Sequence, residues 1–480
     1  MEPIDNLRKI RLQKLEKIKK LKIDPFPAKA SKKQTVEECV KSIGKNVQTA
    51  GRLVGLRGHG GSTFADLKDE SSQIQLFFSK SQLSKVNCQL LDLLDIGDFV
   101  EVSGSVDKTQ AGQITIFVNN FKLLAKSIRP IPSSFYGLKD IETRLRRRYI
   151  DLITNPEAQD LFVKKAKFWT AARNFLIDNN FLEVETPALE AIPGGADATP
   201  FTTHHNALDV DYYLRISLEL YQKRLLVGGF EKTFEIGKIF RNEGIDAEHL
   251  QDYLQMEFYW AYASFEDLID FIEKYYRFII KQTLGEETSK NGDTQINWKN
   301  DWPKIDYFDS FKDATGTDLA KDPKINDLFK LAEKVGAKPN KKLGAGRLID
   351  MIYKKTIRPK IIQPSLLINH PVLVSPLAKR KEDDPQKVER VQVLAAGTEI
   401  GNGWSELNNP IDQQERFEEQ QKLRKEGDTE AQMYDRDFVE ALEYGMPPAA
   451  GFGMSQRFFS VLVDKPIRET VFFPALRPEK

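Results

Sequence analysis

The chain has 480 residues, 40% of them hydrophobic, which is enough for a sizeable core and for two or three domains. Lys and Arg total 71 against 70 for Asp and Glu, so a nucleic-acid partner must be held by local basic patches. The only cysteines, Cys39 and Cys88, lack CxxC spacing, which argues against a zinc site, a disulfide framework or thiol redox chemistry. No apolar run approaches the roughly 18 residues that span a bilayer, and there is no secretory signal, so we expect a soluble cytoplasmic protein.

Residues 1–27 are predicted to form a basic N-terminal helix. From Ile4 to Lys22, apolar residues recur at helical spacing with lysines and arginines between them, and the turn Asp24-Pro25-Phe26-Pro27 ends the pattern. Such a helix either packs on a neighbouring domain or contacts a phosphate backbone, and the pattern leaves both interpretations open. A membrane-surface helix is less favoured.

Residues 28–128 show strand-like patterns in place of the helical pattern of the first segment. Five short β-type runs lie between Val47 and Leu124, separated by Gly, Asp and Asn, with a helical stretch near residues 81–94. This arrangement predicts a small OB-type barrel, and a small barrel of another kind is the alternative. Residues 129–152 begin with the stiff sequence RPIP and are predicted to be a linker.

From residue 153 to residue 480, helical segments alternate with strands, which predicts an α+β domain around an antiparallel sheet. The stretch from about 265 to 346 is helical and charged and lacks the dense motifs on either side of it. We interpret this stretch as a helical insertion.

Three motif clusters in the last domain carry chemistry. The chain has no GxxxxGK[ST] loop, so an ATP-dependent enzyme would have to hold phosphates with arginines and carboxylates. The three clusters supply these groups. The first is FLEVETPAL from Phe181, with the segment that continues through RNEG and LQMEFY. The second is GTEIGNGWSELNNP from Gly397, and the third is GMPPAAGFGMSQRFF from Gly445.

Together with the OB-type segment and GLKDIETRLRRRYIDLI, these clusters resemble class II lysyl-tRNA synthetases over most of the chain. The resemblance implies an anticodon-binding barrel followed by an antiparallel-sheet catalytic domain. It also implies activation of L-lysine with ATP and Mg²⁺, transfer to tRNA(Lys), and a homodimer whose interface includes the segment around Pro187.

The resemblance also implies the ATP site, which comprises Arg241, Glu243, His249, Tyr253, Glu399 and Arg457. Arg241 and Arg457 are the expected catalytic residues, because the reaction must neutralise charge on phosphate oxygens and a guanidinium suits that task. Tyr253 stands where the family usually has a phenylalanine that stacks on adenine.

Lysine recognition is implied for Gly195, Glu219, Arg241, Glu257, Tyr259, Asn402, Trp404 and Glu406. Glu219 is expected to face the α-amino group, and Glu406 with Tyr259 the ε-ammonium. A pocket lined with carboxylates suits a substrate with two ammonium groups and should reject neutral isosteres. Trp404 replaces the usual phenylalanine but keeps an apolar wall.

Some positions depart from the family pattern. The expected metal ligands are Glu399 and Gln392, but the family has a carboxylate in place of Gln392, and an amide brings one negative charge fewer. The segment Met454-Ser455-Gln456 is one residue shorter than usual, and Leu250 stands where asparagine is common.

In the barrel, Phe64 and Gln75 match positions that read the central anticodon uridine, and Asn120 stands where the family often has glutamate. Phe64 could instead be a core aromatic of the barrel.

Three other functions compete with this one. A synthetase for aspartate or asparagine would need cations facing the substrate side chain, and Glu406 with Tyr259 argues against it. A non-catalytic protein that binds tRNA or single strands would not need Arg241, Glu399 and Arg457 together. A relative that lysylates a protein would typically lack the barrel.

Overall fold

The computed structural model describes residues 4–132, 140–244, 249–340, 343–428 and 431–479. The chain divides into two compact units, Met1–Lys139 and Asp140–Lys480. Residues 133–139, which belong to the predicted linker, lie outside the described ranges. Across those ranges no helix combines the length and the apolar character needed to cross a membrane.

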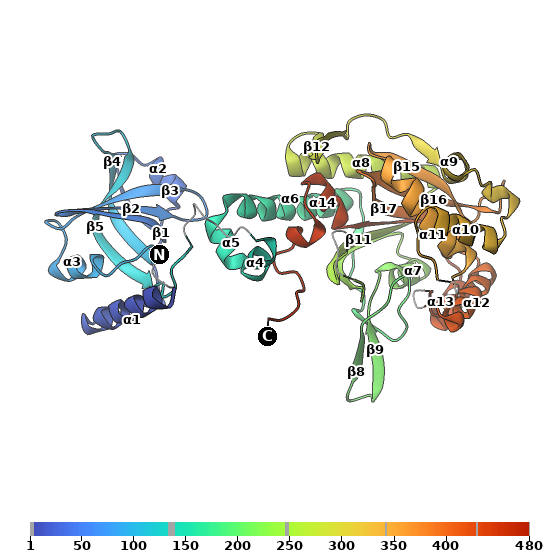
Figure 1. Ribbon diagram of the computed structural model, residues 1–480, viewed down its shortest axis with the longest axis horizontal. Coiled ribbons are helices and arrows are strands. Elements are labelled where there is room, and N and C mark those ends of the chain that lie inside the picture. Colours follow the sequence, from blue (N-terminus) through green and yellow to red (C-terminus); the bar gives the residue numbers. More distant parts are fainter. Residues whose placement is uncertain (1–3, 133–139, 245–248, 341–342, 429–430, 480) are drawn as a thin grey trace. The chain divides into compact units, whose positions relative to one another are not determined.

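The first unit is a closed five-stranded barrel with the strand order β1-β2-β3-β5-β4 (Figure 1). Each strand covers one predicted β run, because alternate residues of these runs are apolar and fill the barrel interior. The OB-type barrel is therefore confirmed. The strands are β1 (Asn46–His59), β2 (Ser62–Lys68), β3 (Gln73–Ser79), β4 (Phe99–Lys108) and β5 (Ile114–Ala125), and the helix after β3 is α3 (Lys85–Leu91).

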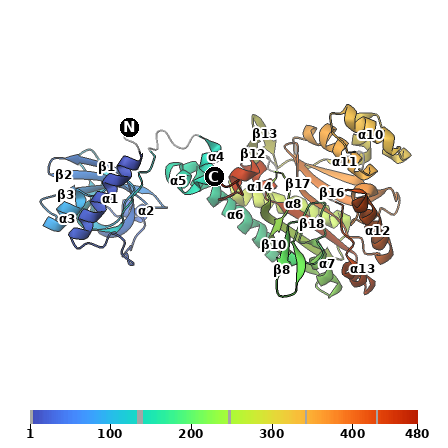
Figure 2. The ribbon, with the colours of Figure 1, turned by 60° about the horizontal axis from the view of Figure 1, so that its bottom comes forward.

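Two further helices accompany the barrel, α1 (Ile4–Lys20) and α2 (Val36–Val40). The helix α1 lies along the barrel (Figure 2). Its apolar face packs against the barrel core through Ile18, which is fully buried. Arg11 fastens the same face, because its guanidinium donates to the carbonyl oxygens of Ile96 at 3.0 Å and of Ser127 at 3.1 Å. Packing on the neighbouring domain thus accounts for one face of this helix, and its other face carries exposed lysines.

The second unit is built on an eight-stranded sheet (Figure 1). All neighbouring strands are antiparallel except the two edge pairs, β14 with β15 and β10 with β6, which are parallel. In sheet order the strands are β14 (Lys304–Asp306), β15 (Ser365–Pro371), β16 (Lys387–Ala395), β17 (Thr398–Ser405), β18 (Ala449–Ser455), β11 (Asp252–Ala261), β10 (Lys232–Phe240) and β6 (Leu182–Glu183).

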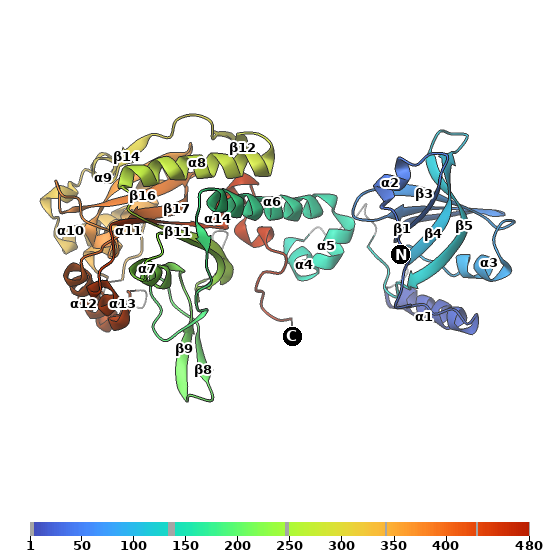
Figure 3. The ribbon, with the colours of Figure 1, turned by 180° about the vertical axis from the view of Figure 1, so that it is seen from behind.

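Two long helices, α6 (Pro156–Asp178) and α8 (Phe265–Leu284), run side by side along one face of this sheet (Figure 3). A capping box of Ser264 and Asp267 begins α8, and Gly285 in the left-handed conformation ends it. Its apolar face is buried with the strands in the largest core cluster. The stretch 265–346 therefore opens with a helix of the main core, and β14 within it joins the main sheet.

Smaller elements complete the unit. A second cluster of buried side chains joins α9, α10 and α11 to β15, and a hairpin of β8 and β9 extends away from the sheet (Figures 1 and 3). The remaining strands are β7 (Leu189–Glu190), β8 (Thr202–His205), β9 (Val210–Leu214), β12 (Thr288–Asn291) and β13 (Thr294–Asn297). The remaining helices are α4 (Ile141–Arg146), α5 (Arg148–Thr154), α7 (Glu219–Val227), α9 (Tyr307–Thr315), α10 (Ile325–Lys334), α11 (Ala345–Thr356), α12 (Pro410–Glu426), α13 (Arg436–Glu443) and α14 (Arg457–Leu462).

Candidate active site

Four adjacent strands, β11, β18, β17 and β16, form the floor of the candidate site. Two rows of residues that pair across neighbouring strands run over this floor. The first row is Glu257–Gly453–Asn402–Gln392, and the second is Tyr259–Gly451–Trp404–Arg390. The rows are two residues apart, so their side chains point to the same face of the sheet. Residues from all three motif clusters thus meet on one surface, with two glycines at the centre.

Two cavities open above this floor, one of about 250 Å³ and one of about 770 Å³. Five carboxylates and four aromatic rings are among the residues that line the smaller cavity, and arginines are numerous in the larger one. Residues lining both include Arg241, Tyr253, Arg390, Glu399 and Arg457. The two predicted catalytic arginines therefore lie where the cavities join.

Glu257 is the best supported carboxylate of the smaller cavity. Its Oε1 accepts hydrogen bonds from the Ser217 hydroxyl at 2.9 Å and the Leu218 amide at 3.0 Å. Its Oε2 accepts from the Tyr259 hydroxyl at 2.8 Å, and the amide of Gln255 donates to Oε1 as well. Because these donors hold both of its oxygens, the carboxyl group of Glu257 has a fixed position in the wall of the cavity.

Glu406 has one engaged oxygen and one that has no partner. Oε2 accepts from the indole of Trp404 at 2.9 Å and pairs with Lys223 at 2.5 Å. Oε1 is buried and has no hydrogen-bond partner among the described residues. An unsatisfied buried acceptor costs about 1–3 kcal/mol, so this oxygen is a binding point for a ligand that carries a donor. Burial raises the pKa of Glu406 to about 7, and Lys223 opposes that rise.

The oxygen has room because residue 451 is glycine. A Cβ at Gly451 would lie 2.2 Å from Oε1 of Glu406 and 2.5 Å from the ring of Tyr259. Gly195 has a similar role at the other end, since its φ of +82° favours glycine and a Cβ would lie 2.9 Å from the Ser217 hydroxyl. Both glycines keep the smaller cavity open.

Glu219 lies on the first turn of α7, and burial raises its pKa to about 8. The side-chain oxygen of Asn402 accepts a hydrogen bond from Arg390 at 3.0 Å, so the side-chain nitrogen of Asn402 points away from Arg390. Arg390 also donates to the Val374 carbonyl oxygen at 2.6 Å and so ties two segments together. The structure therefore brings all the predicted lysine-binding residues to one cavity.

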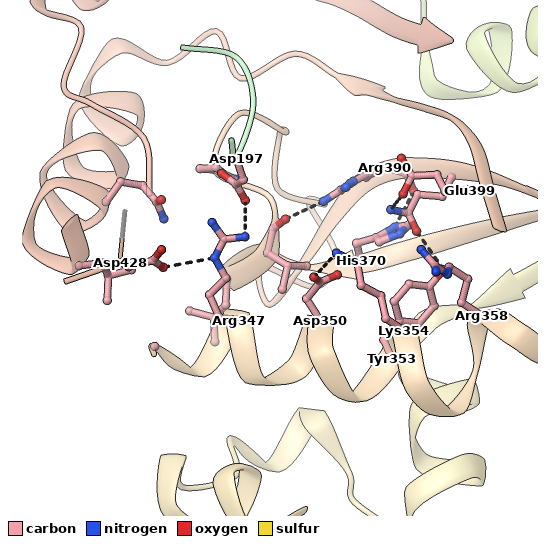
Figure 4. A pocket seen from close by; sticks show the side chains of 18 of the residues that line it. Asp197, Arg347, Asp350, Tyr353, Lys354, Arg358, His370, Arg390, Glu399 and Asp428 are labelled. Carbon is pink, nitrogen blue, oxygen red and sulfur yellow. Dashed lines mark hydrogen bonds and ion pairs between the residues drawn. The ribbon is translucent and has the colours of Figure 1, made fainter. Parts of the chain in front are cut away.

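The larger cavity contains charged side chains from α11 and the sheet (Figure 4). Arg347 lies between Asp197, at 3.3 Å, and Asp428, at 3.2 Å. Asp350, Tyr353 and Lys354 follow on the same face of α11, because residues three and four apart are neighbours on a helix. The cationic groups of this cavity suit a polyphosphate.

The predicted ATP residues lie along this cavity. The Arg241 guanidinium donates from Nε to the Ile216 carbonyl oxygen at 3.2 Å and lies 5.8 Å from the ring centre of Tyr253. Glu243 and His249 are 3.9 Å apart and flank residues 245–248, which the structure does not describe. Both also line the larger cavity.

Gln392 and Glu399 are adjacent, but as a hydrogen-bonded pair. The Gln392 amide nitrogen donates to Oε2 of Glu399 at 2.8 Å, and the hydroxyl of Tyr353 donates to the Gln392 amide oxygen at 3.2 Å. This network fixes the amide with its nitrogen toward the carboxylate, because the opposite orientation would place two acceptors together. In the described part of the chain, no group of three or more His, Cys, Asp or Glu is arranged to hold a metal ion.

The shortened segment Met454-Ser455-Gln456 closes the end of β18. Gln456 is buried, and its amide donates to the Thr470 hydroxyl at 2.8 Å. The Ser455 hydroxyl accepts from the backbone amide of Arg457, the first residue of α14, at 3.2 Å. These contacts place Arg457 at the cavity junction in spite of the missing residue.

The barrel unit carries a separate candidate surface. Phe64 lies on the outer face of β2, half-buried, with its ring centre 5.0 Å from that of Phe77, and Phe77 lies 5.5 Å from Phe117. The barrel interior is filled by other residues, so the core-aromatic interpretation of Phe64 is wrong. Gln75 accepts a hydrogen bond from Thr115 at 2.9 Å, and exposed Asn120 accepts one from Asn87 at 2.9 Å.

Some residues at these surfaces were missed from the sequence. They are Lys223, Tyr353, Arg390, Phe77 and Phe117. The strand QIQLFFS places Phe77 on the face of Gln75, because residues two apart share a face, so alternation could have found it. Lys223 follows Glu219 at helical i,i+4 spacing, a pattern that usually indicates a solvated ion pair.

The comparisons with known proteins agree with this geometry. Residues 140–477 match the class II tRNA synthetases (D, K and N), and residues 47–124 match the OB-fold nucleic acid binding domain. The chain therefore belongs to the class II tRNA synthetase family.

Similar proteins include two lysine–tRNA ligases that are each 41% identical to the chain. That of Carboxydothermus hydrogenoformans aligns over 99% of both chains, and that of Moorella thermoacetica over 100% of this chain and 99% of its own. The lysine–tRNA ligase of Bacillus cereus strain AH187 is 38% identical over 99% of this chain and 98% of its own.

Proposed function

We propose that the chain is a lysine–tRNA ligase, which activates lysine with ATP to lysyl-adenylate and transfers the lysyl group to the 3′ end of tRNA(Lys). The observation that carries this proposal is the unpartnered Oε1 of Glu406 in a cavity lined with carboxylates. That cavity opens beside Arg241 and Arg457, so a lysine held there has its carboxylate near groups that suit phosphates. Since its tRNA substrate is cytoplasmic, we infer that the enzyme acts in the cytoplasm.

Substrate lysine is proposed to lie along the smaller cavity, with its α-amino group at Glu219 and its ε-ammonium at Glu406. Its carboxylate attacks the α-phosphorus of ATP, pyrophosphate leaves, and Arg241 with Arg457 neutralises the charge on the oxygens. In the second step the terminal ribose hydroxyl of tRNA attacks the lysyl carbonyl carbon, and AMP leaves. Glu243, His249 and Tyr253 are proposed to hold the nucleotide.

A synthetase for aspartate is the closest rival, and Lys223 is the only ammonium of a lysine side chain placed against Glu406 in the described structure. It does not serve an acidic substrate, because Glu219 and Glu406 both neutralise it. The unpartnered oxygen at this end of the cavity is an acceptor and suits a substrate group that donates a hydrogen bond, whereas an ionised aspartate side chain has no donor.

Direct charging tests the proposal. The chain, incubated with ATP, magnesium and radiolabelled lysine, is expected to convert tRNA(Lys) to acid-precipitable lysyl-tRNA. A tRNA with an aspartate anticodon and labelled aspartate form the control. Charging of the control pair in place of the lysine pair would show that the assignment is wrong.

The donor set at Glu399 and Gln392 does not fit a magnesium ion held by two protein carboxylates. The Gln392 nitrogen faces Glu399, and its oxygen is used by Tyr353. We therefore propose that magnesium reaches the site with ATP, as part of the substrate, and that Glu399 is the member of this pair whose carboxylate faces it.

Metal binding in the absence of nucleotide tests whether Gln392 weakens the binding of a divalent cation beside Glu399. Wild-type protein is expected to bind Mn²⁺ weakly in the absence of ATP, and Gln392→Glu is expected to bind it at least about tenfold more tightly, because a second carboxylate replaces the amide donor. Titration followed by electron paramagnetic resonance measures the free ion. Equal Mn²⁺ affinity of the two proteins would contradict this account of Gln392.

The barrel is proposed to read the anticodon, with Phe64 as the stacking residue and Gln75 and Asn120 as polar contacts. Phe64 lies on the outer face beside Phe77 and Phe117, which gives a row of rings on which bases can stack.

We further propose a homodimer whose interface includes the segment around Pro187, and sizing chromatography with light scattering tests it.

Phe64→Ala is expected to weaken tRNA charging by about tenfold, since stacking of one base on a ring is worth roughly 1–3 kcal/mol. Lysine-dependent exchange of pyrophosphate into ATP needs no tRNA and should stay at the wild-type rate. Steady-state charging assays with varied tRNA(Lys) measure the first effect.

A tRNA with its central anticodon uridine replaced separates contact from stability. Replacing this base should lower the charging rate of the wild-type enzyme far more than that of the Phe64→Ala variant, because the variant has already lost the contact. Phe26→Ala, which removes an exposed ring elsewhere in the first unit, is the control. Equal sensitivity of wild type and Phe64→Ala to the base change would refute the role of Phe64.

A further inference from the structure

Lys223 is a fully buried lysine beside the proposed substrate pocket. Its ammonium forms an ion pair with Oε1 of Glu219 and a second with Oε2 of Glu406, the latter at 2.5 Å. The rings of Trp404 and Phe438 lie 6.0 Å and 5.8 Å from Nζ and shield it from water. One cation therefore joins the two carboxylates that are proposed to receive the two amino groups of the substrate.

This bridge decides which oxygen of Glu406 is available. Lys223 and Trp404 both engage Oε2, and Oε1 is left without a partner among the described residues. Because two donors hold one oxygen, the carboxylate cannot rotate freely, and its second oxygen points to the side of Gly451 and Tyr259. The direction of the unpartnered oxygen thus depends on Lys223.

The charges of the cavity balance only when Lys223 is counted. The cavity is lined by five acids that carry five negative charges when ionised, against three positive charges on arginines and a fourth on Lys223; the acids are Asp197, Glu219, Glu257, Glu399 and Glu406, and the arginines are Arg241, Arg390 and Arg457. The remaining single negative charge equals the net positive charge of lysine, which has two ammonium groups and one carboxylate. A low-dielectric cavity strongly disfavours any larger excess.

We propose that Lys223 is a positioning and specificity-determining residue of lysine recognition, which holds Glu219 and Glu406 together and presents one oxygen of Glu406 to the ε-ammonium of the substrate. This inference rests on the proposed function and deepens it. Lys223 acts through the two carboxylates and does not touch the reacting atoms.

The two carboxylates also depend on Lys223 for their ionisation. Burial raises the pKa values of Glu219 and Glu406, and Lys223 is the largest opposing influence on both. Glu257 also faces them and raises both pKa values, and the pKa of Tyr259 lies well above 10, so its phenol stays neutral. Removing Lys223 should therefore raise both carboxyl pKa values further, and the acids ionise only at higher pH.

Lys223→Met removes the ammonium and keeps an unbranched side chain that is one atom shorter. We expect its lysine KM at pH 7 to rise by at least about 30-fold, as for a buried charge pair that loses one partner, with little change in the ATP KM. We also expect the midpoint of its lysine KM against pH to move to higher pH. Pyrophosphate exchange between pH 6.5 and 9 measures both, and calorimetry of lysine binding without ATP gives an independent readout.

A double-mutant cycle with Glu406→Gln distinguishes positioning from general destabilisation. If Lys223 acts through Glu406 as well as Glu219, the double variant should lose clearly less lysine affinity than the product of the two single losses, because the part exerted through Glu406 is already gone, whereas independent effects would multiply. Lys126→Met is the matched control, because Lys126 is equally buried and pairs with Asp95 and Asp98 in the barrel unit. It should lower thermal stability without changing the lysine KM or its pH midpoint.

Lys223→Gln serves the same test if Lys223→Met fails to fold. A lysine KM within twofold of wild type, or multiplied effects in the double variant, would overturn the role of Lys223 and leave the proposed function intact. A wild-type enzyme that lysine does not stimulate would instead overturn the proposed function itself.

Discussion

Replacement of Arg241 or Arg457 by alanine should abolish adenylate formation. Both guanidinium groups line the junction of the two cavities, where the lysine carboxylate and the α-phosphate are proposed to meet. Removing one preorganised charge at a transition state typically lowers the rate by about 10²- to 10³-fold. Lysine-dependent exchange of labelled pyrophosphate into ATP measures this rate for each variant.

Arg173→Ala is the control for the loss of an arginine elsewhere in the same unit. Arg173 lies outside both cavities and pairs with exposed Glu183 at 2.9 Å, so this variant should exchange pyrophosphate at the wild-type rate. Arg241→Ala and Arg457→Ala should also keep the oligomeric state of wild type. Loss of that state, or a clear fall in melting temperature, would assign the two arginines a structural role.

Glu406→Gln should raise the lysine KM strongly and the ATP KM little. The amide lacks the charge that faces the ε-ammonium, and a buried charge pair that loses one partner costs about 2–5 kcal/mol, or roughly 30- to 5,000-fold in binding. Pyrophosphate exchange with one substrate varied at a time separates the two KM values.

Glu415→Gln, at an exposed acid of α12, controls for the general effect of removing a negative charge. Its lysine KM should equal that of wild type. If Glu406→Gln also kept the wild-type value, the ε-ammonium would have to bind elsewhere, and the unpartnered oxygen of Glu406 would have no role in recognition.

The barrel could be predicted in detail because β2, β3 and most of β4 alternate between inward and outward side chains. In QIQLFFS the buried residues are Ile74, Leu76 and Phe78, and this period of two is visible in the sequence. The role of α8 could not be read in the same way. Its many charged residues resemble those of a surface insertion, but its apolar stripe is buried against α6 and the sheet.

For the site, motif identity placed the substrate-facing residues, but it could not supply their orientation. The change at position 392 was evident from the sequence, but only the structure shows that its nitrogen faces Glu399. Lys223 illustrates the wider limit. A lysine four residues after a glutamate in a helix usually faces water, and only the packing of Phe438 and Trp404 around it shows that it is buried.

The specificity of amino-acid activation is the central claim, and exchange of labelled pyrophosphate into ATP across the twenty amino acids tests it most directly. The site predicts stimulation by lysine far above every other amino acid, because its cavity combines Glu219, Glu257 and Glu406 with an unpartnered acceptor oxygen. Norleucine, which has the apolar chain but no ε-ammonium, should give almost none. Stimulation by aspartate or asparagine in place of lysine would contradict the account.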